Sequence, residues 1–239
     1  MKIIFVRHAE PDYEHDSLTE KGFREAELLA DMLKDIEVDA YYCSPMGRAQ
    51  ATASFTLEKI GRSAKTLDWL HEFDGKINLG SENEAMCWDM LPREWTAEDG
   101  YYSADSWYKT GIMKTGNAEE EYRKVCRGID ELMAEHGYEH NGRVYKVTES
   151  NHKTLMLFCH FGVMCVILSH IFSCSPMVFW HNFAALPSSV TTIVSEEREE
   201  GIASFRCSAF GELSHLCVAG EEPSFAARFC ECFSDDTRH

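Results

Sequence analysis

Positive charge is scarce in this chain, which has 23 lysines and arginines against 40 aspartates and glutamates and a formal net charge of −17. A surface this acidic repels the phosphate backbone of DNA or RNA, so we expect no nucleic-acid partner. A small anionic substrate is still compatible with this balance if arginines and histidines gather locally and reverse the sign of the potential. The composition therefore excludes one class of ligand and leaves another open.

The sequence also lacks a pair of C-x-x-C motifs, although it contains ten cysteines. Zinc knuckles are therefore not expected, and an unremarkable tail is a better interpretation of Cys230 and Cys232 than a metal or redox pair. The apolar run from Ile3 to Val6 is too short for the core of a secretory signal. We therefore expect reduced thiols and a cytoplasmic location.

Long apolar runs are rare, and the run at 155–172 has to be compared with a membrane span. It is long enough to cross a bilayer, but His160, Gly162 and His170 interrupt it. The run divides better into a buried strand at 155–159 and a buried helix from about 163 to 172. We therefore expect no membrane partner.

Internal repeats are absent, and the chain instead alternates expected strands and helices. Residues 2–6 predict a central strand that is apolar on both faces, and Thr19 can cap the helix that follows. The other expected elements are a strand at 38–43, helices at about 46–60 and 119–136, a strand at 144–147, and a hairpin of 190–194 and 203–207 around the charged turn SEEREEG. This order predicts a three-layer α/β/α fold, in which helices cover both faces of a mostly parallel central sheet.

The segment from about 74 to 118 has a different character, because it is rich in Trp, Tyr and Gly and lacks a single period. No flexible linker brackets it, so we interpret residues 1–239 as a single domain with an insertion at about 74–118. Its aromatic residues could line a pocket, with Arg93 or Lys109 meeting a second anionic group, or they could simply pack the insertion onto the body. Our hypothesis is that the insertion covers a substrate site and sets its selectivity.

Basic side chains follow three of the expected strands. Arg7 and His8 end the first, Arg48 follows the second, and His160 ends the strand at 155–159. Ligands of open α/β sheets bind beyond the carboxyl ends of the strands, so these four groups should meet at one edge. Their charges repel one another unless an anion lies between them, and the forked donors of arginine match phosphate oxygens. The pattern therefore predicts a phosphate site.

Five short motifs occur in one order along the chain: R-H-A-E at 7–10, L-T-E-K-G at 18–22, S-P-M-G-R-A-x-x-T-A at 44–53, W-L-H-E-F at 69–73 and C-H-F-G at 159–162. Together they resemble the histidine phosphatase superfamily, the phosphoglycerate mutase-like group of branch one. The resemblance extends from residue 2 to about residue 195. It implies a phosphoglycerate mutase-like fold.

The resemblance also implies roles for five residues. His8 would be the nucleophile that forms a phosphohistidine, with a neutral ring whose other N–H is held by the backbone. Arg7 and Arg48 would hold the transferring phosphoryl group, and His160 would be a further donor to it. Glu72 would protonate the leaving oxygen and then activate water. No metal or other cofactor is implied, because the cationic side chains take its place.

Some positions depart from the family's pattern. Where members active on sugar phosphates often have glycine, a polar residue, a hydroxyl and asparagine, this chain has Ala9, Glu10, Pro11 and Glu14. Pro11 removes a hydroxyl that could reach phosphate, and Glu14 would repel phosphate if it pointed inward. The segment around Glu72 lacks the longer arginine-bearing pattern of glycolytic mutases, which favours a phosphatase acting on a small phosphorylated metabolite.

Three other functions stay open: a mutase-type phosphoryl transfer, a phosphohistidine-protein phosphatase, and a non-catalytic protein that binds a phosphorylated ligand. Asp74 or Glu82 could also take the role given to Glu72. A cysteine nucleophile fits less well, because Cys43 to Arg48 is C-x(4)-R, one residue short of the cysteine-phosphatase loop. No pattern specifies an oligomeric state.

Two further histidines, His136 and His140, flank Gly137. A glycine at this position argues against a pair of metal ligands on one helix. A solvated loop is the interpretation that we adopt for them.

Overall fold

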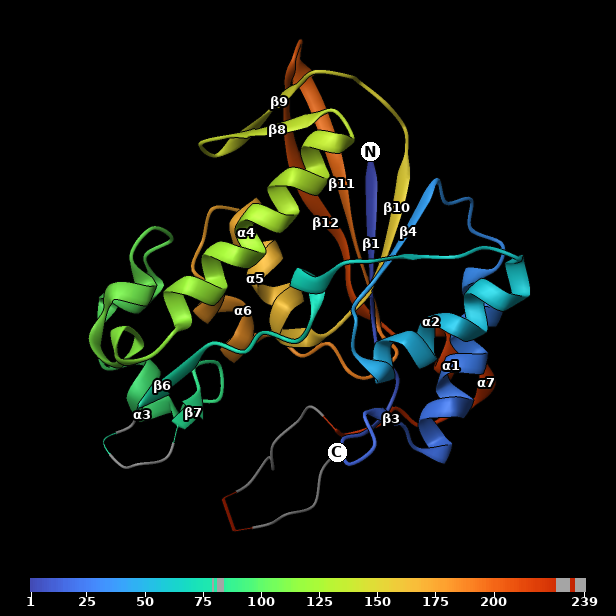
Figure 1. The fold of residues 1–239 in the computed structure, drawn as a ribbon, viewed down its shortest axis with the longest axis horizontal. Coiled ribbons are helices and arrows are strands. Elements are labelled where there is room, and N and C mark those ends of the chain that lie inside the picture. Colours follow the sequence, from blue (N-terminus) through green and yellow to red (C-terminus); the bar gives the residue numbers. More distant parts are fainter. Residues whose placement is uncertain (79, 81–83, 227–232, 235–239) are drawn as a thin grey trace.

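A central sheet lies between two layers of helices (Figure 1). The computed structural model describes residues 1–78, 80, 84–226 and 233–234. Within these residues the sheet has eight strands in the order β5-β4-β10-β1-β11-β12-β9-β8. The predicted three-layer α/β fold is confirmed.

The strands of the main sheet are β1 (Lys2–Arg7), β4 (Ala40–Cys43), β5 (Lys65–Thr66), β8 (Tyr138–Asn141), β9 (Val144–Val147), β10 (Thr154–Cys159), β11 (Val190–Glu199) and β12 (Ile202–Glu212). Strands β5, β4, β10 and β1 are parallel, and antiparallel strands extend the sheet beyond β1. Two short antiparallel pairs lie outside this sheet: β2 (Pro11–Asp12) with β3 (Ser17–Leu18), and β6 (Lys76–Asn78) with β7 (Glu84–Met86).

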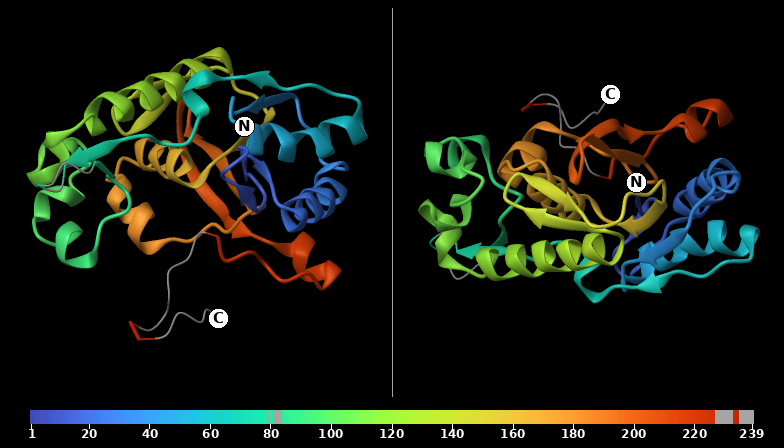
Figure 2. Two further views of the ribbon diagram at one scale, coloured as in Figure 1. Left: turned by 60° about the horizontal axis from the view of Figure 1, so that its bottom comes forward. Right: turned by 90° about the horizontal axis from the view of Figure 1, so that it is seen from above.

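The α-helices are α1 (Glu20–Leu33), α2 (Gly47–Ile60), α3 (Pro92–Trp95), α4 (Ala118–Glu135), α5 (Phe161–Ile171), α6 (Pro176–Asn182) and α7 (Ser214–Ala219). Short 3₁₀ helices are η1 (Asp68–Leu70), η2 (Asp99–Tyr102), η3 (Trp107–Lys109) and η4 (Gly111–Thr115). Helices α1, α2 and α7 lie on one side of the sheet, and α4, α5 and α6 lie on the other (Figures 1 and 2).

Strand β1 contributes to both hydrophobic cores. Ile3 and Phe5 belong to the core under α4 and α5, whereas Ile4 and Val6 belong to the core under α1 and α2. This division follows from strand geometry, since successive side chains point to opposite faces. An uninterrupted apolar run is therefore the pattern of a central strand with helices on both faces, as predicted.

Helix α1 begins where the sequence predicts it. The Thr19 hydroxyl accepts a hydrogen bond from the Gly22 N–H at 3.0 Å, which satisfies one of the free donors of the first turn. Phe23 on this helix is 42% exposed, although the apolar spacing would place it with the buried Ala26, Leu29, Ala30 and Leu33. The helix predicted at about 119–136 corresponds to α4, and its apolar spacing gives one buried face with Tyr122, Val125, Cys126, Ile129, Leu132 and Met133.

Two local expectations are wrong. His140 does not lie in a solvated loop, because Tyr138–Asn141 form strand β8, and His136 lies in the turn after α4 with its imidazole half-buried. The charged segment SEEREEG is not simply a turn either, since β11 continues to Glu199 before the chain reverses. The backbone hydrogen bonds of an antiparallel ladder do not depend on apolar side chains, so polar residues can occupy these strands.

The aromatic segment at 74–118 is joined to the main core by several of its largest side chains. Tyr101, Trp107 and Met113 are buried there, and the Trp107 ring meets the Tyr122 ring of α4 edge-on at 5.3 Å. Tyr101 and Trp107 therefore pack the segment onto the core. Trp88 and Trp95 are only partly buried against it. The single-domain interpretation stays a prediction.

Several expectations concern residues or properties outside this fold. Among the described residues, no helix is both long and apolar enough to cross a membrane. The cysteines of the described part of the chain are free thiols, and the cytoplasmic location stays a prediction. Glu82, Cys230 and Cys232 lie outside the described residues.

Candidate active site

The register of two parallel strands brings His8 and His160 together. Arg7 on β1 pairs with Cys159 on β10, and the His8 N–H donates to the Cys159 carbonyl at 3.0 Å. The residue that follows each strand, His8 after β1 and His160 after β10, therefore lies at the same carboxyl edge of the sheet. The centroids of the two imidazole rings are 5.1 Å apart.

The His8 ring has a defined tautomer. Its Nδ1 lies 2.7 Å from the Ala9 carbonyl oxygen, and because a carbonyl can only accept, Nδ1 carries the proton. The lone pair of Nε2 is then free. Burial lowers the pKa of His8 well below its usual value, and the charges of Arg7 and Arg48 lower it further. At neutral pH the ring is therefore uncharged and able to act as a nucleophile.

The His160 ring is oriented by Ser44, a residue whose role the sequence did not reveal. The Ser44 hydroxyl oxygen accepts from the Met46 N–H at 3.2 Å, so its own proton can be donated to His160 Nε2 at 2.7 Å. The ring proton then lies on Nδ1. Burial lowers the pKa of His160 well below its usual value, and the neighbouring His8 adds to the effect. His160 is therefore a neutral donor within the site.

Arg7 is held by the backbone on the far side of the site. Its Nη1 donates to the Ala185 carbonyl at 2.6 Å, and its guanidinium lies over the Phe161 ring at 5.8 Å. Burial lowers the pKa of Arg7, and the nearby carboxylate of Glu72 acts in the opposite direction. Arg7 is 4% exposed, so its position is determined by packing rather than by solvent.

Arg48 is held by Asp16, another residue that the sequence did not single out. Arg48 Nη1 donates to Asp16 Oδ1 at 2.7 Å, and Asp16 Oδ2 accepts from the Gly47 N–H at 2.6 Å. The carboxylate thus caps the N-terminus of α2, where negative charge is favourable, while it orients the guanidinium. A polar residue in a short turn between β2 and β3 gives no local sign of this contact.

Glu72 lies against the N-terminus of α5, which begins directly after His160. Its Oε1 accepts from its neighbour Phe73 N–H at 2.8 Å and from the Val163 N–H at 3.0 Å. A Cβ atom at Gly162 would lie 2.7 Å from the same oxygen, so a larger residue there would displace the Glu72 carboxyl group from this position. Asp74, the alternative, is exposed and lies 3.7 Å from Lys76 at the surface.

Other residues discussed from the sequence are structural or lie outside the cluster. Thr52 donates to the Arg48 carbonyl at 2.8 Å and accepts from the Ala9 N–H at 3.0 Å, so it joins α2 to the loop after β1. Pro11 is buried in β2, and Glu14 is exposed. Burial raises the pKa of Cys43 to about 12, which leaves a protonated thiol and argues against a cysteine nucleophile.

The four basic residues form a closed site with free donors. Arg7, His8, Arg48 and His160 are 4%, 2%, 6% and 0% exposed. Within the described chain, Arg7 Nε, Arg48 Nε and His160 Nδ1 are buried without a hydrogen-bond partner. Buried N–H groups are rarely left unpaired in proteins. An anion with several acceptor oxygens, such as phosphate, would satisfy them.

Replacement of Ser44 by alanine tests the orientation of His160. Losing this hydrogen bond should lower kcat/KM for p-nitrophenyl phosphate about fivefold, since a typical buried hydrogen bond contributes about 1 kcal/mol. Ser54→Ala is the matched control, because the Ser54 hydroxyl only donates to the Ala51 carbonyl within α2. Steady-state kinetics of both variants provide the measurement. Equal activity of Ser44→Ala and Ser54→Ala would contradict the assignment.

Comparison with known proteins gives one family. The family model "Histidine phosphatase superfamily (branch 1)" matches residues 3–208. A curated relative, the 2,3-bisphosphoglycerate-dependent phosphoglycerate mutase of Thermoplasma acidophilum, is 36% identical over 96 residues, which are 35% of this chain and 48% of the relative. The match thus spans about half the length of that relative.

Solved structures with the same fold are more distant in sequence. A mutant phosphoserine phosphatase from Entamoeba histolytica in complex with phosphoserine has a TM-score of 0.59 and 19% identity, covering 90% of this chain and 98% of that chain. A mycobacterial glucosyl-3-phosphoglycerate phosphatase has a TM-score of 0.60 and 15% identity, covering 88% and 98%. At this identity the likeness shows the fold alone.

Proposed function

Because the chain belongs to the histidine phosphatase superfamily (branch 1), whose members are phosphatases or mutases, we propose that it hydrolyses a small phosphomonoester through a phosphohistidine on His8. The observation that carries this proposal is the set of buried, unpartnered donors around the His8–His160 pair. A protein that only bound a phosphorylated ligand would have no need of a neutral imidazole with a free Nε2 among them.

In the first half of the reaction, His8 Nε2 attacks phosphorus while the bond from phosphorus to the ester oxygen breaks. Glu72 donates its proton to the departing oxygen. Arg7, Arg48 and the His160 Nδ1–H donate to the three equatorial oxygens, whose charge is greatest in the transition state. The product alcohol leaves, and the phosphoryl group stays on His8.

In the second half, water attacks the phosphohistidine and Glu72 takes its proton. The bond between phosphorus and nitrogen breaks, inorganic phosphate is released, and His8 returns to its neutral form. The same carboxyl group thus serves as acid and then as base, and each turnover leaves its protonation unchanged. The backbone donors of Phe73 and Val163 hold Glu72 Oε1 in place and leave Oε2 for the proton.

Hydrolysis is favoured over mutase chemistry by the surroundings of Glu72. A mutase has to bind a second charged group and keep water out while the substrate turns, and the segment after Glu72 lacks the arginine-bearing pattern of glycolytic mutases. The phosphorylated ligands named for two structural neighbours, phosphoserine and glucosyl-3-phosphoglycerate, support a small phosphorylated metabolite as the substrate class. Measuring the phosphate released from a panel of substrates separates this class from the alternatives. The panel contains phosphoglycerates, sugar phosphates, nucleotides and a phosphohistidine protein.

The 74–118 segment supports the site from one side. Trp88 Nε1 donates to the carbonyl of Phe73, next to Glu72, at 3.0 Å, and the Trp95 ring stacks on His181 of α6 at 4.9 Å. Because Trp107 is part of the core, deletion of the whole segment would expose that core. Single substitutions at Trp88 or Trp95 are therefore the better test of the hypothesis that this segment sets selectivity.

The variant Glu72→Gln tests the acid–base assignment. Glutamine can still accept from the Phe73 and Val163 N–H groups, so the local structure should persist. Turnover of an alkyl phosphate should fall about 10²- to 10⁴-fold, because an alkoxide leaves slowly without a proton. With p-nitrophenyl phosphate, whose leaving group needs no proton, we expect a burst of about one p-nitrophenol per chain followed by slow turnover.

Rapid-mixing kinetics measure the burst, and Asp74→Asn is the matched control. This neighbouring carboxylate lies at the surface beside Lys76, so its loss should leave both phases unchanged. If Asp74→Asn reproduced the defect while Glu72→Gln did not, the acid–base role would belong to Asp74.

A further inference from the structure

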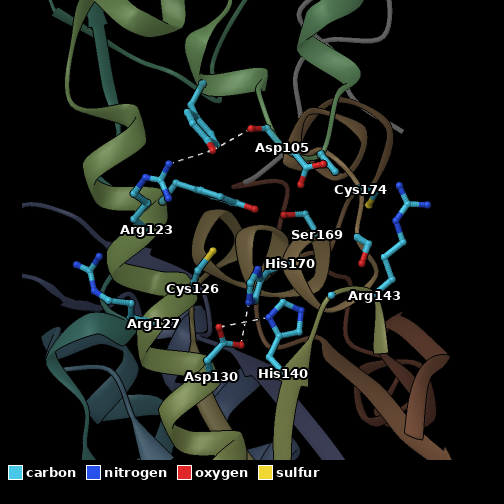
Figure 3. Close-up of a pocket in the computed structure, with 15 residues that line it drawn as sticks. Asp105, Arg123, Cys126, Arg127, Asp130, His140, Arg143, Ser169, His170 and Cys174 are labelled. Atoms are coloured by element: carbon cyan, nitrogen blue, oxygen red, sulfur yellow. Dashed lines mark hydrogen bonds and ion pairs between the residues drawn. The ribbon is translucent and has the colours of Figure 1, made fainter. Parts of the chain in front are cut away.

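A second cluster of polar side chains lies away from the catalytic site. Figure 3 shows Asp130 of α4 beside the rings of His140 on β8 and His170 at the end of α5. Asp130 Oδ1 lies 2.9 Å from His170 Nε2, and Asp130 Oδ2 lies 3.5 Å from His140 Nδ1. These residues border a cavity of about 470 Å³ whose lining includes none of the five predicted catalytic residues.

The fold brings these three residues together from separate elements. A tight turn at Gly137, with φ of 90°, reverses the chain after α4 and places β8 back along the helix. Helix α5 packs against α4 and presents His170 in its last turn. The side chains of Asp130, His140 and His170 are 31%, 23% and 14% exposed, so the cluster is half-buried but open to the cavity.

The spacing of the three side chains fits one metal ion. Each offers a ligand atom, and these atoms lie within 4.8 Å of one another. Zinc bound tetrahedrally at about 2.0–2.1 Å from each ligand requires ligand atoms roughly 3.3 Å apart. The two imidazoles contact different oxygens of Asp130, so side-chain rotation has to bring one oxygen and both nitrogens closer together around the ion. The imidazole rings have centroids 4.4 Å apart, so small rotations bring both toward a shared centre.

The chemistry of the set also favours a transition metal. Two imidazoles and one carboxylate are ligands that suit zinc, iron or nickel rather than magnesium or calcium. Close by, the Tyr145 ring contacts His140 at 5.2 Å, and its hydroxyl is buried with no hydrogen-bond partner among the described residues. A hydrogen-bonded Asp–His pair alone would not explain the second imidazole.

We propose that Asp130, His140 and His170 bind one divalent transition-metal ion, with Zn²⁺ as the representative ion. Water in the cavity occupies the fourth coordination position. The ion ties the β8–β9 hairpin to α4 and α5. It lies outside the catalytic machinery, so hydrolysis at His8 does not require it.

Zinc binding to the full-length, EDTA-treated protein tests the proposal. Competition with a colorimetric chelator should give one Zn²⁺ per chain, and Zn²⁺ should raise the melting temperature. His140→Ala and His170→Ala should each weaken this site at least a hundredfold and remove the thermal shift. His140→Gln and Asp130→Asn are second variants for the case in which an alanine variant does not fold, as judged by circular dichroism.

Three controls distinguish this site from others. His152→Ala removes an exposed histidine outside the cluster, His8→Ala removes a catalytic imidazole, and a Cys207→Ser/Cys217→Ser double variant removes two exposed thiols. Each control should bind Zn²⁺ as the parent protein does. The proposal is overturned if the parent protein binds no Zn²⁺ at micromolar concentration, if His140→Gln binds as well as the parent, or if one of the controls removes the binding.

Discussion

Replacement of His8 by alanine is expected to abolish the hydrolysis of p-nitrophenyl phosphate, with a fall in kcat of at least about a thousandfold, because the group proposed to accept the phosphoryl is removed. No other described side chain at this edge is an equivalent nucleophile. His160 Nε2 lies 2.7 Å from the Ser44 hydroxyl and is occupied by that hydrogen bond, and burial raises the pKa of the nearby Cys159 thiol. Release of p-nitrophenol, measured under steady-state conditions, quantifies the loss.

Trapping of the intermediate makes this experiment specific. The parent protein, quenched during turnover of a labelled phosphomonoester, should carry an acid-labile phosphoryl group, and His8→Ala should carry none. His152→Ala, at an exposed histidine in the turn before β10, should behave as the parent does. Substantial turnover by a folded His8→Ala protein would refute the mechanism, and a non-catalytic binding protein would show no turnover in any variant.

Arg48→Ala is expected to lower kcat/KM for the same substrate by about a hundred- to a thousandfold, as for the removal of other donors to a transition-state oxyanion. The guanidinium is 6% exposed, and although Nη1 is paired with Asp16, its Nε has no partner among the described residues and is available to an anion. Arg48→Lys keeps the charge but loses the fork, so an intermediate loss is expected. Inhibition by inorganic phosphate should be strongest in the parent protein, weaker in Arg48→Lys and weakest in Arg48→Ala.

Two comparisons separate catalysis from stability at Arg48. Arg62→Ala is the matched control, because Arg62 lies just after α2 with its guanidinium over the Tyr41 ring at 5.9 Å, far along the helix from the site. Asp16 loses its partner in Arg48→Ala, but its side chain is 46% exposed and water can solvate it, so thermal stability should change little. Activity equal to that of Arg62→Ala would remove Arg48 from the proposed mechanism.

Asp16 occupies groups that would otherwise attract the substrate phosphate. Its carboxylate occupies one edge of the Arg48 guanidinium and the N-terminus of α2, both of which attract phosphate. A substrate phosphoryl group and Asp16 would therefore repel each other across Arg48.

The backbone positions of the site could be predicted from local patterns. The apolar runs at 2–6 and 155–159 are typical of central parallel strands, and such strands carry whatever follows them to one edge of the sheet. That is why the sequence alone predicts that Arg7, His8 and His160 lie together. The Thr19 cap and the buried stripe of α4 are equally local, because they depend on residues only three or four positions apart.

The partners of these side chains could not be predicted in the same way. Ser44 and His160 are 116 positions apart in the chain, and Asp16 and Arg48 are 32 positions apart. Both contacts depend on how strands and loops align in space. Strand β8 was missed because its residues, YEHN, have no apolar alternation, and its pairing with β9 comes from the tight turn between them.

Residues near one another in the chain therefore specified the strands, the helix starts and the basic character of the edge, because those depend on side-chain periodicity and short-range hydrogen bonds. Packing of α4 and α5 against each other and against β8 placed Asp130, His140 and His170 around one point. Hydrogen bonds and ion contacts of that kind act over about 3 Å, so they form only once the long-range arrangement of the chain has put their atoms within reach.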